Sequence, residues 1–311
     1  MRRSREQWKQ RFSQHLLMRG LSPRTAEDYS AELKPLFEFL QERGNPKPNE
    51  VTRDDLDAYR QHLFTLEHRG QRIGMGAQAR RIRAVKSFFA YLADEAAILV
   101  NPAAHLRQPK VPKTLPRQLL SEGETETLLG CPDITTPLGI RNRAILEVLY
   151  ATAIRNTELR QLETGDVDLG RLELFVSRGK GGKSRRLPLG EEAAAWLEDY
   201  LRNARPTLAG PTSGHLLFLS AGGRMIDRGR LSILVRKAAA ACGLDKHVTP
   251  HLLRHCCATH MLRRGAGIRQ LQALLGHAGL ETTQRYTRVD IGDLHKTVSR
   301  YHPREQGFGE P

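Results

Sequence analysis

The sequence of 311 residues contains only four cysteines, and their spacing follows no pattern. Cys131, Cys242, Cys256 and Cys257 include no C-x-x-C pair, and a disulfide framework is implausible in so long a chain. No stretch approaches 18 consecutive apolar residues, as a membrane-spanning helix would need. The first residues are charged and lack the apolar centre of a signal peptide. We therefore expect reduced thiols, no membrane contact and a cytoplasmic location.

A phosphate-binding P-loop is also missing. Gly182-Lys183-Ser184 resembles the end of that motif, but the motif needs a glycine five positions before its second glycine, where Ser177 stands. The motif also needs a helix to follow, whereas the next residues are strand-like and contain Pro188. The sequence predicts no nucleotide cofactor.

A zinc site is an alternative in one segment. The H-x-x-x-H pair of His251 and His255 is followed closely by Cys256, Cys257 and His260. The residue after His251 is a leucine, however, where an H-E-x-x-H motif has its general-base glutamate. We therefore expect no metal, and the histidines are open to other roles.

Positive charge is what the chain has in excess. It contains 49 Lys and Arg against 34 Asp and Glu, which gives a formal charge of +15. A surplus of this size favours a polyanionic partner and salt-dependent binding, as expected for nucleic acid. Basic proteins also bind membranes or simply stay in solution, so the charge alone does not identify the partner.

The composition and one unusual segment predict two domains. A chain of 311 residues with 39% hydrophobic content is long enough for two globular cores. Residues 101–117 contain four prolines, four basic residues and no acid, as an extended linker would. We predict domains at 1–100 and 118–311, with Lys110 and Lys113 of the linker lying along a phosphate backbone.

The first domain is predicted to be a small helical bundle. Capping residues Ser4, Ser22 and Thr52 begin three helices, and a fourth covers about residues 77–93, each with an apolar stripe. The fourth helix carries a basic group that could enter a DNA groove or bind phosphates: Arg80, Arg81, Arg83 and Lys86. A solvated charged face is the alternative for this group.

The second domain is predicted to mix helices with a few strands. Helices are expected at 137–151, 156–162 and 191–203 and from 228 to the end, with a strand at 216–219. Residues 172–176 and 185–189 read as a β-hairpin whose tip contains Lys180 and Lys183. A last amphipathic helix, 290–301, could pack on its own domain or on a neighbouring subunit.

Two histidines, an arginine and a tyrosine form the chemically informative set. A helix begun at Thr249-Pro250 would carry His251, Arg254 and His255 on one face. A tyrosine such as Tyr286 has a pKa near 10 and needs a base to become a nucleophile, and His251 suits that role. A planar guanidinium such as that of Arg254 can bind two phosphoryl oxygens at once. His255 could instead be a hydrogen-bonded core histidine.

The segments T-P-H-L-L-R-H-C-C-A-T-H-M-L (249–262) and L-L-G-H-A-G-L-E-T-T-Q-R-Y-T (274–287) resemble the tyrosine recombinases, nearest the bacterial Xer and phage integrase type. Residues 151–159, A-T-A-I-R-N-T-E-L, fit the first arginine block of that family. Ala153 replaces the usual glycine and Thr157 the usual serine. The resemblance implies that Arg155 is a second arginine of the phosphate clamp.

The resemblance implies further roles. Tyr286 would be the nucleophile, His277 would orient the phosphate, and Lys180, in the family's G-K-G pattern, would be the general acid. The implied fold is mainly α with a small β-sheet: a SAM-like core-binding helical bundle followed by an α+β catalytic domain.

The implied function is site-specific DNA recombination through a covalent 3′-phosphotyrosine, in dimer resolution or in integration and excision of mobile elements. The expected partners are double-stranded DNA and further subunits, in a tetramer on paired sites that could include a second, related recombinase, at the bacterial nucleoid. Type IB topoisomerase, telomere resolvase and non-catalytic DNA-binding protein are the alternatives.

Overall fold

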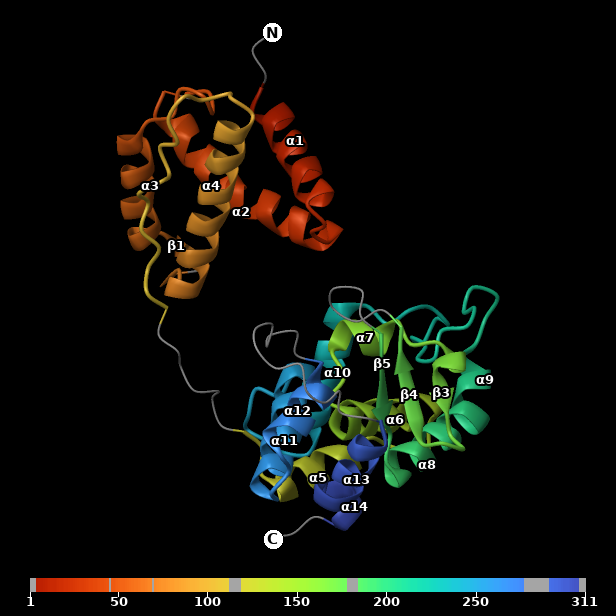
Figure 1. Cartoon of the computed structure of the whole chain (residues 1–311). Coiled ribbons are helices and arrows are strands. Elements are labelled where there is room, and N and C mark those ends of the chain that lie inside the picture. Colours follow the sequence, from red (N-terminus) through yellow and green to blue (C-terminus); the bar gives the residue numbers. More distant parts are fainter. Residues whose placement is uncertain are drawn as a thin grey trace. The chain divides into compact units, whose positions relative to one another are not determined.

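A computed structural model describes residues 4–44, 46–68, 70–111, 119–177, 184–276 and 291–307. The chain divides into two compact units, Met1–Leu115 and Pro116–Pro311 (Figure 1). The division falls inside the segment 101–117, whose function as a linker stays a prediction. None of the helices in these described ranges is both long and apolar enough to cross a membrane.

The first unit is a helical bundle, as predicted. Its elements are α1 (Arg5–Met18), α2 (Pro23–Glu42), α3 (Arg53–Thr65), β1 (Glu67–His68), β2 (Gln71–Arg72) and α4 (Met75–Asp94). The side chains of Ser4, Ser22 and Thr52 cap the first three helices, because each accepts a hydrogen bond from a backbone N–H of the first turn. Phe12, Leu36 and Phe88 from three helices are fully buried in one core. The short antiparallel hairpin β1–β2 was not predicted.

The second unit contains the remaining elements, and most of them are helices. They are α5 (Glu122–Gly130), α6 (Pro137–Thr152), α7 (Asn156–Arg160), η1 (Thr164–Asp166), β3 (Val167–Asp168), β4 (Glu173–Val176), β5 (Arg185–Pro188), α8 (Glu191–Asp199), a π-helical turn η2 (Tyr200–Ala204), α9 (Arg205–Leu208), α10 (Arg228–Ala241), α11 (Pro250–Arg263), α12 (Ile268–Leu275), α13 (Ile291–Tyr301) and α14 (Pro303–Gln306). The mainly α fold with a small sheet is therefore confirmed.

Helix α6 is the centre of this second unit. Every residue from Ala144 to Thr152 is buried, as expected for a helix covered on all sides. The helix packs against α5, α8, η2, α9 and α11. Its C-terminal end therefore has a fixed position inside the domain, and the following turn is placed by the core.

The small sheet is antiparallel, in the order β3-β4-β5. Leu174 pairs with Leu187, and Val176 pairs with Arg185, which confirms the predicted hairpin pairing. Because side chains alternate along a strand, buried Leu187 and exposed Arg186 lie on opposite faces of β5. The hairpin tip, residues 178–183, lies outside the described residues.

The strand predicted at 216–219 was wrong. Leu217 and Leu219 are fully buried, but Leu216 and Leu219 make only isolated bridges, to Glu163 and Met225. The apolar run therefore fills the core as irregular chain. The prediction failed because a short apolar run in the sequence does not distinguish a buried strand from other buried chain.

The last helices pack on their own domain. Leu294 and Val298 of α13 are buried in the core of the second unit, and α13 contacts β5, α11 and α12. Figure 1 shows α13 and α14 beside each other at one end of this unit. The apolar face of α13 was predicted to pack either on its own domain or on a neighbouring subunit. In this single chain it packs on its own domain.

Candidate active site

A left-handed turn after α6 places the first arginine. Ala153 has φ 49° and ψ 30°, the conformation that favours glycine, which explains why glycine would be usual at this position. The chain then turns into α7, and Arg155 is the N-cap residue of that helix. The Arg155 side chain retains 24% of its exposure, so it is a half-buried cation at the surface of the domain core.

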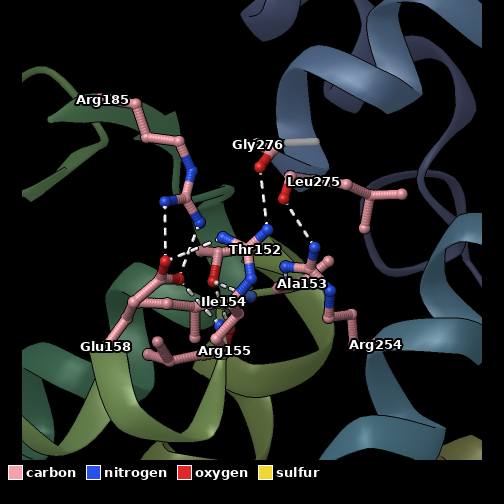
Figure 2. Close-up of polar contacts among 10 residues, drawn as sticks. Thr152, Ala153, Ile154, Arg155, Glu158, Arg185, Arg254, Leu275 and Gly276 are labelled. Carbon is pink, nitrogen blue, oxygen red and sulfur yellow. Dashed lines mark hydrogen bonds and ion pairs between the residues drawn. The ribbon is translucent and has the colours of Figure 1, made fainter. Parts of the chain in front are cut away.

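Glu158 joins two arginines from different elements (Figure 2). Its Oε1 accepts hydrogen bonds from Nη1 of Arg155 at 2.9 Å and Nη1 of Arg185 at 3.0 Å. Its Oε2 accepts from the backbone N–H of Arg155 at 3.0 Å and from Nη2 of Arg185 at 2.8 Å. These hydrogen bonds and the two positive charges overcome burial and lower the pKa of Glu158 to about 2. The carboxylate is therefore ionised at neutral pH.

Arg254 reaches the same place from α11. Thr249 caps this helix, and Pro250 is its first residue, as predicted. The Arg254 guanidinium donates to the carbonyl oxygens of Ala153 and Leu275. Burial, and then the charges of Arg155 and Arg185, lower its pKa to about 10, so it keeps its charge at neutral pH.

The C-terminal end of α12 is the meeting point of the arginines. Gly276 ends this helix in the left-handed conformation, and its carbonyl oxygen accepts from Nη2 of Arg155 at 2.8 Å. Arg155 and Arg254 thus hold successive carbonyls, those of Gly276 and Leu275 (Figure 2). The negative end of the helix dipole lies here and offsets some of the repulsion between the guanidiniums. His277 is the next residue in the sequence.

His251 and His255 both lie on the exposed side of α11. Burial lowers the pKa of His251, with the nearby charges of Arg254 and His255 adding to the effect. A neutral imidazole can accept a proton, which is what a general base needs. Both histidines and Arg254 line a groove of about 410 Å³ between α11 and α12. His255 is therefore not the buried core histidine considered from the sequence.

His260 is the core histidine of this helix. Its Nδ1 lies 2.9 Å from the hydroxyl of Tyr150, and its Nε2 lies 2.9 Å from the carbonyl oxygen of Leu120. Cys256 and Cys257 are also buried in the core. Nowhere in the described part of the chain do three histidine, cysteine or acidic side chains gather in a way that could hold a metal ion. The zinc alternative therefore has no support from these residues.

Three predicted catalytic residues lie outside the described residues: Lys180, His277 and Tyr286. Their roles stay predictions. The structure brings together Arg155, Arg254 and His251, since Arg254 makes hydrogen bonds next to Arg155 and lines the same groove as His251.

The predicted DNA-binding residues of α4 have different environments. Arg80 and Arg81 both pair with Glu32 of α2, with Nε to carboxylate distances of 3.1 and 3.7 Å, whereas Arg83 is exposed. Lys86 donates to the carbonyl oxygens of Ala104 and Leu106, so it anchors the chain that follows α4. In the segment 101–117, Lys110 is exposed and Lys113 lies outside the described residues.

Sequence reasoning did not identify Glu158 and Arg185 as site residues. Glu158 was part of the quoted arginine block, but no role was assigned to it. Its position three residues after Arg155 was the available signal. Arg185 gave no local signal, because a basic residue after a Gly-Lys turn is ordinary in a hairpin. Only the fold shows that β5 lies beside α7.

The model of the phage integrase family matches residues 118–292, and that of the "Phage integrase, N-terminal SAM-like domain" matches residues 10–96. The chain belongs to this family, the tyrosine recombinases. It is 41% identical to tyrosine recombinase XerC 2 of Ralstonia nicotianae over 93% of this chain and 83% of the relative. It is 38% identical to tyrosine recombinase XerD of Pseudomonas putida over 93% of this chain and 94% of the relative.

Solved structures show the same fold. The Tn1549 transposon integrase in complex with circular intermediate DNA matches with a TM-score of 0.68 and 20% identity, covering 93% of this chain and 98% of that one. A lambda integrase dimer bound to a core site matches with a TM-score of 0.66 and 20% identity, covering 93% of this chain and 100% of that one.

Proposed function

We propose that the protein is a site-specific DNA recombinase that cleaves and rejoins strands through a phosphotyrosine at Tyr286. The observation that supports this most is the convergence of Arg155 and Arg254 on the turn that leads to His277. Two guanidiniums from distant segments at one point suit a phosphodiester. The relatives named tyrosine recombinases and the integrase structures with bound DNA support DNA as the partner.

In the proposed reaction His251 accepts the proton of the Tyr286 hydroxyl as the phenolic oxygen attacks phosphorus. The depressed pKa of His251 keeps its imidazole neutral and ready to accept this proton. Lys180 gives a proton to the leaving 5′ oxygen. The DNA 3′ phosphate is then esterified to tyrosine, and reversal with a second strand rejoins DNA. One ester replaces another, so no nucleotide cofactor is required.

Arg155 and Arg254 stabilise charge on the non-bridging oxygens, and His277 orients the same phosphate. Each guanidinium has five N–H groups and uses two of them in the hydrogen bonds described above. The remaining N–H groups make no hydrogen bond to the residues that the structure describes, and we propose that they bind phosphate oxygens. Loss of the N–H donors of either arginine should slow cleavage by about 100- to 1,000-fold.

Assembly is the second part of the proposal. We propose a tetramer on two paired DNA sites, acting in dimer resolution or in mobile-element integration, with a second recombinase as an optional partner. The lambda integrase tetramer bound to a Holliday junction has the same fold, with a TM-score of 0.66 and 19% identity. The exposed Arg83 and Lys110, together with Arg80, Arg81 and Lys113, are the proposed phosphate contacts outside the catalytic unit.

A nicked suicide DNA substrate tests the chemistry. The wild type should form a covalent adduct that resists denaturation, and Tyr286→Phe should form none. Arg155→Ala and Arg254→Ala should retain most DNA binding while losing cleavage. An adduct that persists in Tyr286→Phe would refute the assignment. If the wild type forms no adduct on DNA fragments recovered from its own genome, the protein is a non-catalytic DNA-binding protein. If it relaxes plasmids that lack a specific site, it is a topoisomerase.

A further inference from the structure

Arg185 of β5 is a third guanidinium beside the two clamp arginines, and neither the family resemblance nor the proposed mechanism uses it. Its side chain is only 15% exposed, and it makes two parallel hydrogen bonds to Glu158. Its Nε is buried with no hydrogen-bond partner among the described residues. One N–H of each Nη is used by Glu158 and Nε is covered, so Arg185 has two N–H groups left, fewer than Arg155 or Arg254 has for a phosphate.

The contacts of Glu158 indicate what Arg185 does. The carboxylate accepts four hydrogen bonds, two from Arg155 and two from Arg185. Both oxygens are therefore occupied, and only Nη1 of the Arg155 guanidinium is held by the acid. The other terminal nitrogen, Nη2, is free to bind the Gly276 carbonyl.

Without Arg185, Glu158 would have one negative charge and two vacant acceptor sites next to a single guanidinium. A bidentate pair with Arg155 is then the favoured geometry, because fork-to-fork pairing is the strongest arrangement of these two groups. Such a pair would turn Arg155 away from the Gly276 turn. It would also neutralise the charge that the phosphate needs.

The packing at Gly276 fixes Arg185 in place. A Cβ built at this glycine would lie 3.0 Å from Nε and 3.1 Å from Cζ of Arg185. Gly276 is therefore packed close to the end of the Arg185 side chain, and Figure 2 shows both residues beside Arg155. One side chain thus touches both the acid that orients Arg155 and the turn that Arg155 holds.

We propose that Arg185 is a positioning residue of the recombination reaction, which occupies Glu158 and thereby leaves Arg155 free to bind the scissile phosphate. This inference rests on the proposed function. It predicts that the harm done by losing Arg185 comes from the uncovered carboxylate. Removing the charge of that carboxylate should therefore restore cleavage. A purely structural role predicts instead that cleavage and thermal stability are lost and recovered together.

The test compares Arg185→Met, Glu158→Gln and the double variant by single-turnover cleavage of the suicide substrate at saturating DNA. Arg185→Met should cleave about 100-fold more slowly, as expected for a misplaced catalytic group, with an unchanged DNA Kd. The double variant should regain at least about 10-fold of that loss, because a neutral glutamine no longer captures the Arg155 charge. Arg186→Met is the matched control, since Arg186 is exposed on the same strand and pairs with Glu173 at 2.9 Å.

The outcomes separate the two proposals. A wild type that forms no Tyr286 adduct refutes the proposed function and this inference together. A normal wild-type adduct with an Arg185→Met rate equal to that of Arg186→Met refutes the inference alone. A double variant that is as slow as Arg185→Met, or slower, also refutes it, and thermal unfolding of each variant shows whether the domain has remained folded.

Discussion

His302 makes the stability of the second unit depend on pH. The side chain is fully buried, and its Nδ1 accepts a hydrogen bond from the backbone N–H of Arg304 at 3.2 Å. Its Nε2 lies 3.4 Å from the carbonyl oxygen of Tyr150 and must therefore carry the ring proton. A second proton would have to sit on Nδ1, facing the Arg304 N–H. Only the neutral ring fits this position.

The energetic consequence follows from the pKa. Burial lowers the pKa of His302 from 6.5 to about 4, and the charges of Arg264, Arg304 and a protonated His260 act in the same direction. The unfolded chain binds a proton near pH 6.5, so the folded state is at its most stable above that pH and loses stability as the pH falls toward 4. Between pH 7 and pH 5 the loss from this one group is about 2 kcal/mol.

Urea unfolding followed by tryptophan fluorescence measures this loss. In a Trp8→Phe background the signal comes from Trp196, whose ring lies 4.7 Å from the Arg143 guanidinium in the second unit. His302→Gln keeps one donor and one acceptor but does not titrate. From pH 7 to pH 5 the free energy of unfolding should fall by about 2 kcal/mol more in the protein with His302. The other titrating groups are the same in both proteins, so the difference isolates His302 together with its coupling to His260. Equal losses would refute the argument.

Four further results are expected. Ala153→Gly should leave the midpoint of chemical unfolding unchanged or higher, because relief of the left-handed alanine offsets the entropy that glycine adds to the unfolded chain; a clear fall would contradict this. Lys86→Met should speed tryptic cleavage at Arg107 without changing the helical content by circular dichroism, with exposed Arg83→Met as the control. Arg304→Met should lower the free energy of unfolding in urea by about 3 kcal/mol, because it removes one cation from the buried Glu147. Arg202→Met, which breaks an exposed ion pair, should lower it by less than about 1 kcal/mol. Sulfate should raise the unfolding temperature more than sodium chloride of equal ionic strength, and Arg155→Met should reduce the difference; equal effects of the two salts would be against an anion site.

The helices could be predicted because their determinants are local. Three helices begin with a capping box, at Ser4, Thr52 and Ser121. The sequence shows each box as a serine or threonine followed three residues later by Gln, Asp or Glu. The apolar stripes then give the buried faces. The two strands of the hairpin could also be predicted, because the apolar alternation of residues 172–176 and 185–189 is local, whereas the pairing of Leu174 with Leu187 is seen only in the structure. These predictions needed no knowledge of distant contacts.

The site could be predicted only in part. The motifs named Arg155 and Arg254, and the helix spacing placed His251 beside Arg254, because each of those inferences needs only neighbours in the sequence. The partners of these residues are distant: Arg185 is 27 residues from Glu158, and Gly276 is 121 residues from Arg155. The buried contacts of His302 and Arg304 reach back more than 150 residues, to Tyr150 and Glu147. No local pattern contains that information.

The charge of the cluster can be compared with that of its proposed substrate. Arg155, Arg185 and Arg254 contribute three positive charges and Glu158 one negative charge, which leaves +2 where the arginines meet. A phosphodiester has one negative charge, and a phenolate that attacks it brings a second. The protein must hold like charges together before any substrate arrives, and it does so with one carboxylate and the carbonyl oxygens of Ala153, Leu275 and Gly276. In the proposed reaction such an arrangement would be complementary to the transition state rather than to DNA at rest, because the second negative charge appears only during attack.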